Sequence, residues 1–248
     1  MLHIMGRSSS FVFLLLLHCF MACLVWSDTN IITDKSALLA FKSFITSDPH
    51  NFLANWSVSF SPCSWIGITC NTRHGRVHSL NLGGMDLKGT ISPQLGNLSF
   101  LVELNLSDND FHDQIPNELV QLRRLELLNL SYNDFHGPVP AWMGDLSSLE
   151  QLNLRNNSLN GFIPLSLFNL SRLETLNLVS NSIEGTIPLE VGRLQRLSTL
   201  DLGANKLSGN IPNTISNLSS LELLSLSHNN LSGSIPSEIG NLSQLKKL

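Results

Sequence analysis

The chain repeats itself every 24 residues without insertion or deletion, and few sequence features restrict a fold as strongly. One copy runs from Leu149 to Arg172. Copies begin at Val77, Leu101, Leu125, Leu149, Leu173, Leu197 and Leu221, and an eighth starts at Leu245. A fixed period of this length is typical of a solenoid, in which each coil packs mainly against its two neighbours. The period therefore predicts a stack of similar coils over residues 77–248.

The columns of the repeat indicate how one coil is built. Positions 4, 6 and 22 are leucine in every complete copy, and position 11 is always leucine, isoleucine or phenylalanine. The alternation of positions 4 and 6 predicts one short strand per repeat with one buried face. Positions 15 and 16 read Ile-Pro or Val-Pro in six copies, and proline disfavours a helix interior there.

Position 9 is asparagine from the second copy onward, whereas the first copy has Met85. An asparagine side chain has two N–H donors and an acceptor, so stacked copies can bond backbone groups of their own and the neighbouring coil. We therefore expect a ladder that begins at the second coil. Its members are Asn109, Asn133, Asn157, Asn181, Asn205 and Asn229.

Residues 1–27 have the pattern of a secretory signal peptide. Arg7 precedes an apolar run from Phe11 to Trp26, and Val25 and Ser27 suit a cleavage site before Asp28. The alternative is an uncleaved anchor, for which a run of about 16 residues is short. Secretion places Cys63 and Cys70 in an oxidising compartment, where such a pair favours a disulfide; two free thiols or half of a metal site are the alternatives.

The segment before the repeats is expected to cover the first coil. Residues Thr33 to Ile45 predict an amphipathic helix that Thr33 or Asp34 caps, and Asp48-Pro49 ends it. At the other end, the last complete coil has only residues 245–248 against it. The apolar side chains expected to be partly exposed there are Leu224, Leu226, Leu231, Ile235, Ile239 and Leu242.

The repeat pattern LxxLxLxxNxLxGxIPxxLGxL resembles the plant-type leucine-rich repeat, and the Cys-x-Trp-x-Gly-x-x-Cys of residues 63–70 resembles the cap that precedes such repeats. The resemblance implies a right-handed leucine-rich-repeat solenoid of the α/β class, with a parallel sheet on its concave face. A helical cap would span 28–76, and seven repeats plus the start of an eighth would span 77–248. The chain as a whole resembles an N-terminal fragment of a plant leucine-rich-repeat receptor-like kinase ectodomain, notably of the immune type.

Positions 7 and 8 vary most among the residues expected on the concave face, so partner recognition can select them. The candidates for ligand contact are Tyr132, Arg155, Val179 and His228, since aromatic residues and arginine favour interface hot spots. Nine Asn-x-Ser/Thr sequons also occur. The glycosylation candidates are Asn55, Asn97, Asn169, Asn217 and Asn241, because Asn105 and Asn129 are expected to face a partner.

The sequence contains no recognisable catalytic motif and no residue pattern that requires a cofactor or a metal. A formal net charge of −4 argues against a nucleic-acid surface. The resemblance implies an extracellular module of a serine/threonine receptor kinase for defence or developmental signalling. It would bind a peptide or protein, recruit a shorter co-receptor of the same repeat class, and attach to the membrane through missing C-terminal segments. The alternative is a secreted inhibitor of the polygalacturonase-inhibiting type.

Overall fold

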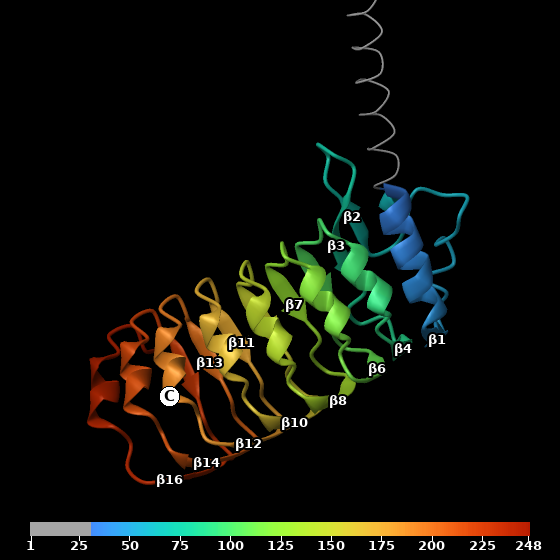
Figure 1. Ribbon diagram of the computed structural model, residues 1–248. Coiled ribbons are helices and arrows are strands. Elements are labelled where there is room, and N and C mark those ends of the chain that lie inside the picture. Colours follow the sequence, from blue (N-terminus) through green and yellow to red (C-terminus); the bar gives the residue numbers. More distant parts are fainter. Residues whose placement is uncertain (1–30) are drawn as a thin grey trace, which may run out of the picture.

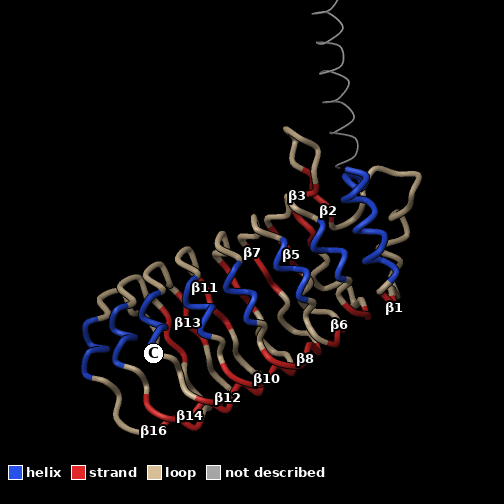
Figure 2. The backbone as a smooth tube through the Cα atoms, in the orientation of Figure 1, coloured by secondary structure: helices blue, strands red, loops and turns tan. Residues whose placement is uncertain are grey.

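The computed structural model describes residues 31–248, so the predicted signal peptide lies outside the described residues. The chain forms a curved row of coils that starts with a helix over residues 31–43 and ends with the last coil (Figure 1). Each coil contributes a strand to each of two sheets and a short 3₁₀ helix, and the three kinds of segment form separate rows along the solenoid (Figure 2). The predicted leucine-rich-repeat solenoid with its parallel sheet is therefore confirmed.

The first sheet contains the strand predicted from positions 4 and 6. Its strands pair in parallel and in register, except that β2 joins β3 antiparallel at the cap. Because positions 4 and 6 point into the solenoid, Leu104 and Leu106 are fully buried. The strands are β2 (Ile68–Cys70), β3 (Val77–Asn81), β5 (Glu103–Asn105), β7 (Leu127–Asn129), β9 (Gln151–Asn153), β11 (Thr175–Asn177), β13 (Thr199–Asp201) and β15 (Leu223–Ser225).

A second sheet was not predicted, since we expected only one strand per repeat. Position 11 is buried in the first six coils and half-buried in the seventh, and a residue with positive φ follows at position 13, which explains the recurring glycine there. The strands are β1 (Ile45–Ser47), β4 (Lys88–Thr90), β6 (Asp110–Asp113), β8 (Asp134–Pro138), β10 (Ser158–Phe162), β12 (Ser182–Gly185), β14 (Lys206–Asn210) and β16 (Asn230–Ser232).

The 3₁₀ helices follow the Ile-Pro pairs. Proline stands at the N-cap in coils two to seven, where the absence of its N–H has no consequence for the helix. The helices are η1 (Pro62–Ser64) in the cap, then η2 (Pro93–Asn97), η3 (Asn117–Gln121), η4 (Ala141–Asp145), η5 (Leu165–Asn169), η6 (Leu189–Arg193), η7 (Asn213–Asn217) and η8 (Ser237–Asn241).

The N-terminal helix closes the first end of the solenoid, but its predicted bounds and cap were wrong. The helix covers residues 31–43, and Ile45 begins β1 instead of ending the helix. Asp34 lies inside the helix, fully buried, and therefore does not cap it. On the buried face of the helix, Phe41 stacks on Phe111 of the second coil, which in turn stacks on Phe135 of the third.

Only some of the apolar side chains that we expected to be exposed on the last coil are exposed. Leu224, Ile239 and Leu242 are buried, which contradicts the expectation for these three side chains. The last residues also pair with this coil, since the Leu224 N–H donates to the Lys247 carbonyl at 3.0 Å. Leu226 and Leu231 are half-buried, and Ile235 is 65% exposed. Exposed apolar surface at this end is therefore found at position 15 and at Leu248, which is 75% exposed.

Candidate ligand-binding face

The outward side of the first sheet is a continuous polar surface. Position 5 is asparagine in the first five coils, and each of these amide oxygens accepts from the backbone N–H two residues later, as Asn105 Oδ1 does from Ser107. Asn105 Nδ2 also donates to Asn81 Oδ1 at 3.1 Å. Next to them, Glu103 accepts from Ser79 Oγ at 2.9 Å. The surface thus presents hydrogen-bonding groups on a regular backbone, which suits an extended partner.

Position 8 holds an unusual backbone conformation in every coil. Its residue has positive φ, from Gly84 in the first coil to His228 in the seventh, because the chain turns sharply after each strand of the first sheet. Glycine, asparagine and aspartate tolerate this conformation, whereas a bulky side chain is strained there. Tyr132 occupies position 8 with φ of 53° and is 40% exposed. A strained aromatic side chain on an open surface suggests a functional reason for its presence.

The structure brings two of the predicted contact residues into contact, places a third on the adjacent coil and leaves the fourth apart. The Arg155 guanidinium lies 5.4 Å from the centre of the Tyr132 ring, within the range of a cation–π contact. No carboxylate within the described residues forms an ion pair with Arg155. Val179 is half-buried at position 7 of the next coil, adjacent to Arg155 along the row, and its carbonyl accepts from the Asn156 N–H at 2.7 Å. His228 is exposed two coils beyond Val179, away from this pair.

The asparagine ladder holds the turns that carry positions 7 and 8. Asn109 Nδ2 donates to the carbonyls of Leu82 and Leu106, at 2.8 and 3.1 Å, and its Oδ1 accepts from the Leu87 N–H at 2.8 Å. The same pattern recurs at Asn133, Asn157, Asn181, Asn205 and Asn229, each of which bonds to the preceding coil. These bonds hold the backbone of the turns in place, and their role is therefore structural.

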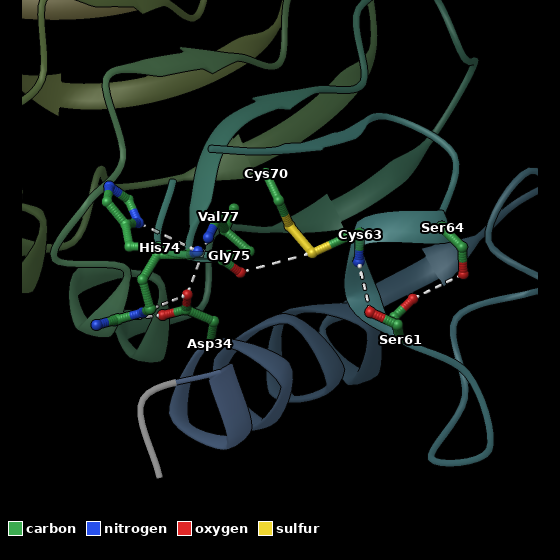
Figure 3. Close-up of a disulfide and its surroundings, with 9 residues drawn as sticks. Asp34, Ser61, Cys63, Ser64, Cys70, His74, Gly75 and Val77 are labelled. Carbon is green, nitrogen blue, oxygen red and sulfur yellow. Dashed lines mark hydrogen bonds and ion pairs between the residues drawn. A yellow bond between two sulfur atoms is a disulfide. The ribbon is translucent and has the colours of Figure 1, made fainter. Parts of the chain in front are cut away.

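The cap contains a disulfide between Cys63 and Cys70, whose Cα atoms are 5.4 Å apart. Beside it, Asp34 of the N-terminal helix accepts from the Val77 N–H at the start of β3 (Figure 3). Asp34 also receives two hydrogen bonds from Arg76, at 2.8 and 2.7 Å, and both side chains are buried. The sequence analysis did not predict this ion pair, because an acidic residue near the start of a helix is usually interpreted as its N-cap.

One lateral edge of the first sheet carries a repeated ion pair between position 24 and position 2 of the same coil. Arg172 pairs with Glu150, and Arg196 pairs with Glu174 at 2.8 Å. In the second coil Arg124 has Val102 at position 2 and therefore lacks this partner. Its guanidinium lies 4.1 Å from the centre of the Phe100 ring instead.

The sequons differ in accessibility. Asn97, Asn169, Asn217 and Asn241 end their 3₁₀ helices and are exposed, away from the first sheet. Asn55 is half-buried in the cap, and its Nδ2 donates to the Ser64 carbonyl at 3.1 Å. Attachment of a glycan to Nδ2 is therefore least compatible with the fold at Asn55.

The described residues contain little that could serve another kind of site. No group of three or more potential metal ligands gathers there, and no described helix is long and apolar enough to cross a bilayer. A hollow of about 230 Å³ lies between the fifth and sixth coils, lined by Leu189, Arg193 and Asn217 among others. This volume is below that of typical small-molecule pockets, which begin at about 300 Å³.

Comparison with known families agrees with this architecture. A leucine rich repeat N-terminal domain matches residues 31–71, and leucine rich repeats match residues 100–122, 124–146, 140–183, 196–218 and 220–242. The chain belongs to the leucine-rich-repeat family, with an N-terminal domain of that family as its cap.

Its relatives are plant receptor kinases. A segment of 70 residues, 28% of this chain and 7% of the relative, is 54% identical to the LRR receptor-like serine/threonine-protein kinase EFR of Arabidopsis thaliana. Among solved structures, the LRR ectodomain of the Arabidopsis thaliana membrane receptor kinase GASSHO1/SCHENGEN3, in complex with CASPARIAN STRIP INTEGRITY FACTOR 2, has a TM-score of 0.81 at 34% identity. That match covers 87% of this chain and 29% of the ectodomain.

A third similarity is to the Arabidopsis receptor kinase HAESA, solved with the peptide hormone IDA and the co-receptor SERK1. Its TM-score is 0.62 at 29% identity, over 86% of this chain and 44% of that chain. The chain spans less than half the length of each of these three proteins. The similarity lies in the cap and repeats.

Proposed function

We propose that this chain is part of the extracellular recognition region of a plant receptor-like serine/threonine kinase, and that it binds a peptide or protein on its first sheet. The observation that carries the proposal is the contact between Tyr132 and Arg155. It combines a strained, exposed tyrosine with a guanidinium that has no acidic partner among the described residues, on a polar surface with a row of asparagine amides. Arginine and tyrosine are the residues that most often dominate binding energy at interfaces.

The relatives support a peptide ligand and a co-receptor. GASSHO1/SCHENGEN3 and HAESA were both solved with peptide or protein ligands, and HAESA also with SERK1. The similarity to receptor kinases favours a receptor over a secreted polygalacturonase-inhibiting protein. By the same similarity, signalling in defence or development and recruitment of a shorter leucine-rich-repeat co-receptor belong to the proposal.

The proposal includes passage through the secretory pathway. The Cys63–Cys70 disulfide and the four exposed sequons suit an extracellular protein. Mass spectrometry of protein secreted from plant cells should find an N-terminus at Asp28, no free thiol at Cys63 or Cys70, and glycans at Asn97, Asn169, Asn217 and Asn241. An N-terminus at Met1 would contradict cleavage of the signal peptide.

Ligand binding can be tested with the full chain and an array of synthetic peptides from plant and microbial secreted proteins. Peptides that bind the fluorescently labelled chain should lose at least about tenfold in affinity on Tyr132→Ala and on Arg155→Ala, the loss typical of a hot spot. His136→Ala is the matched control, because His136 is exposed on β8 of the second sheet. Equal losses with His136→Ala, or none with the other two, would contradict the proposal.

A further inference from the structure

The arginine at position 24 is paired with a glutamate in the fourth and fifth coils, whereas the arginine at position 24 of the second coil has no acidic partner among the described residues and lies over a phenylalanine at the same edge. We define the basic edge as His74, Arg76, Phe100, Arg123 and Arg124. Phe100 is half-buried at position 24 of the first coil, and three of the other side chains surround its ring. The Arg76 guanidinium lies 4.6 Å from the ring centre, the Arg124 guanidinium 4.1 Å, and the His74 ring 4.6 Å.

The charges of the basic edge are unevenly neutralised. Arg76 is buried and paired with Asp34, so its charge is compensated inside the protein. Arg123 is exposed and donates to the Asp145 backbone carbonyl at 2.8 Å, which leaves its charge without a counter-ion. Arg124 is also exposed, and no carboxylate of the described residues lies within 4.0 Å of its guanidinium. Two cationic groups on successive residues are thus left without an ion-pair partner among the described residues, Arg123 directed toward the third coil and Arg124 toward the first.

The protein itself shows what fits beside an arginine at position 24. In the fourth and fifth coils the guanidiniums of Arg172 and Arg196 are met by glutamates that lie 22 residues earlier, at position 2. The equivalent residue for Arg124 is Val102, which has no charged group. A carboxylate supplied from outside can therefore occupy the place above Val102 that Glu150 and Glu174 fill in their own coils.

We propose that the basic edge is a second docking surface, separate from the face that carries Tyr132 and Arg155, and that it binds an acidic segment of a protein partner. A ligand carboxylate accepts hydrogen bonds from Arg124 above Val102, and an apolar neighbour in the same segment contacts the free part of the Phe100 ring. The planar fork of arginine suits a carboxylate in particular, because it can donate two parallel hydrogen bonds. The ring also holds the guanidinium in place before binding.

The test uses the full chain and two fluorescein-labelled peptides, acetyl-Glu-Leu-Glu-Leu-Glu-amide and the same peptide with glutamine in place of glutamate. Fluorescence anisotropy should show binding of the glutamate peptide and at least about tenfold weaker binding of the glutamine peptide, as expected for charge-assisted hydrogen bonds. Equal affinity of the two peptides would overturn the proposal. So would inorganic phosphate displacing the peptide at a lower concentration than acetate does, since that would identify a phosphate site instead.

Two variants locate the binding. Val102→Glu supplies Arg124 with the acid that other coils have, and we expect it to weaken binding of the glutamate peptide at least about tenfold without removing any basic group. The fold accommodates it, because four other coils have glutamate at position 2. Arg124→Gln should have a similar effect by removing the donor.

Matched controls separate this surface from general charge and from the proposed function. Ser198→Glu adds the same charge at position 2 of the sixth coil, and Arg172→Gln removes an arginine from a coil in which it is paired. Both should bind the peptide as the unmodified chain does, and so should Tyr132→Ala. If Val102→Glu and Arg124→Gln retain full affinity, or if the controls lose as much, the basic edge is not the docking surface.

Discussion

The two ends of this solenoid are covered in different ways. At the first end both sheets finish in an antiparallel strand, β1 on β4 and β2 on β3, and the N-terminal helix buries Phe41 against the coils. At the other end the first sheet finishes in a single bridge between Leu223 and Lys247. The difference is largest at position 15, where Ile187 of a middle coil is 3% exposed and Ile235 of the last coil is 65% exposed.

The comparison shows that the burial of an apolar side chain depends on the neighbouring coil and not only on the sequence of its own coil. The seven repeats have nearly the same apolar columns, and yet the same isoleucine is buried in one coil and exposed in another. Stability in such a stack is close to a sum of nearest-neighbour terms. Substitutions at equivalent positions should therefore differ in cost according to the coil in which they are made.

The largest effect is expected at the covered end. Asp34→Ala leaves Arg76 buried without its counter-ion and the Val77 N–H without its acceptor, so the free energy of unfolding should fall by about 3–5 kcal/mol. Urea denaturation followed by circular dichroism measures this change. The control is Asp110→Ala, which breaks the exposed ion pair with Lys88 and should lower the free energy of unfolding far less. Similar costs for the two variants would show that the cap pair does not secure this end.

Position 15 gives the most direct comparison between coils. Ile187→Ser removes a buried apolar side chain and places a hydroxyl there, which should lower the free energy of unfolding by about 3 kcal/mol. Ile235→Ser makes the same change where the side chain is already mostly in water, and should cost about 0.5 kcal/mol or less. If both variants unfold at the same urea concentration, a neighbouring coil does not determine the cost.

Hydrogen exchange tests the same contrast without substitution. Amides in residues 221–248 should exchange about a hundredfold faster than those in 125–196, a difference of about 2.7 kcal/mol in local opening, because the last coil has a neighbour on one side only. Equal protection in a sample that sedimentation shows to be monomeric would refute this.

The smallest effect concerns the exposed pair of Lys88 and Asp110. The hydrogen bond from the ammonium to the Asp110 carboxylate, followed by the attraction between their charges, raises the pKa of Lys88 above its usual value. A raised folded-state pKa means that the contribution to stability is present below the unfolded-state pKa and lost as the pH rises through the folded-state pKa. The small stability difference between the unmodified chain and Lys88→Met should therefore stay constant at neutral pH and be lost as the pH rises through the raised pKa of Lys88. Loss of the difference at neutral pH would contradict this origin.

Much of the fold could be predicted from the repeats, because the same residue at the same position in many copies indicates the same local structure in each. Leucine at positions 4 and 6 and asparagine at position 9 each recur often enough to predict a strand and a turn. The second sheet was missed because its strands show only one buried column, position 11, flanked by varied polar residues. The 3₁₀ helices were also not predicted, since the proline columns indicated only where a helix interior could not be.

Features that occur once were much harder to predict. The pairing of Asp34 with Arg76 joins residues 42 positions apart, and no column repeats it. The contact of Tyr132 with Arg155 depends on the left-handed turn at position 8, which a tyrosine does not suggest. The basic edge had one sequence signal, the valine at position 102 in a column that is mostly acidic, but that signal has meaning only beside the ion pairs of other coils.

The uninterrupted register of both sheets has a consequence for how such a chain can change over time. Every coil meets its neighbours through the same backbone partners, such as Leu104 opposite Leu128 and Leu128 opposite Leu152. A gene that loses or duplicates one unit of this length keeps its reading frame, and the flanking coils still meet in register. The surface then becomes shorter or longer by one strand, about 5 Å, while Tyr132 and the basic edge shift relative to each other as rigid parts. Gain or loss of whole repeats can thus change the spacing between two surfaces without changing the residues of either.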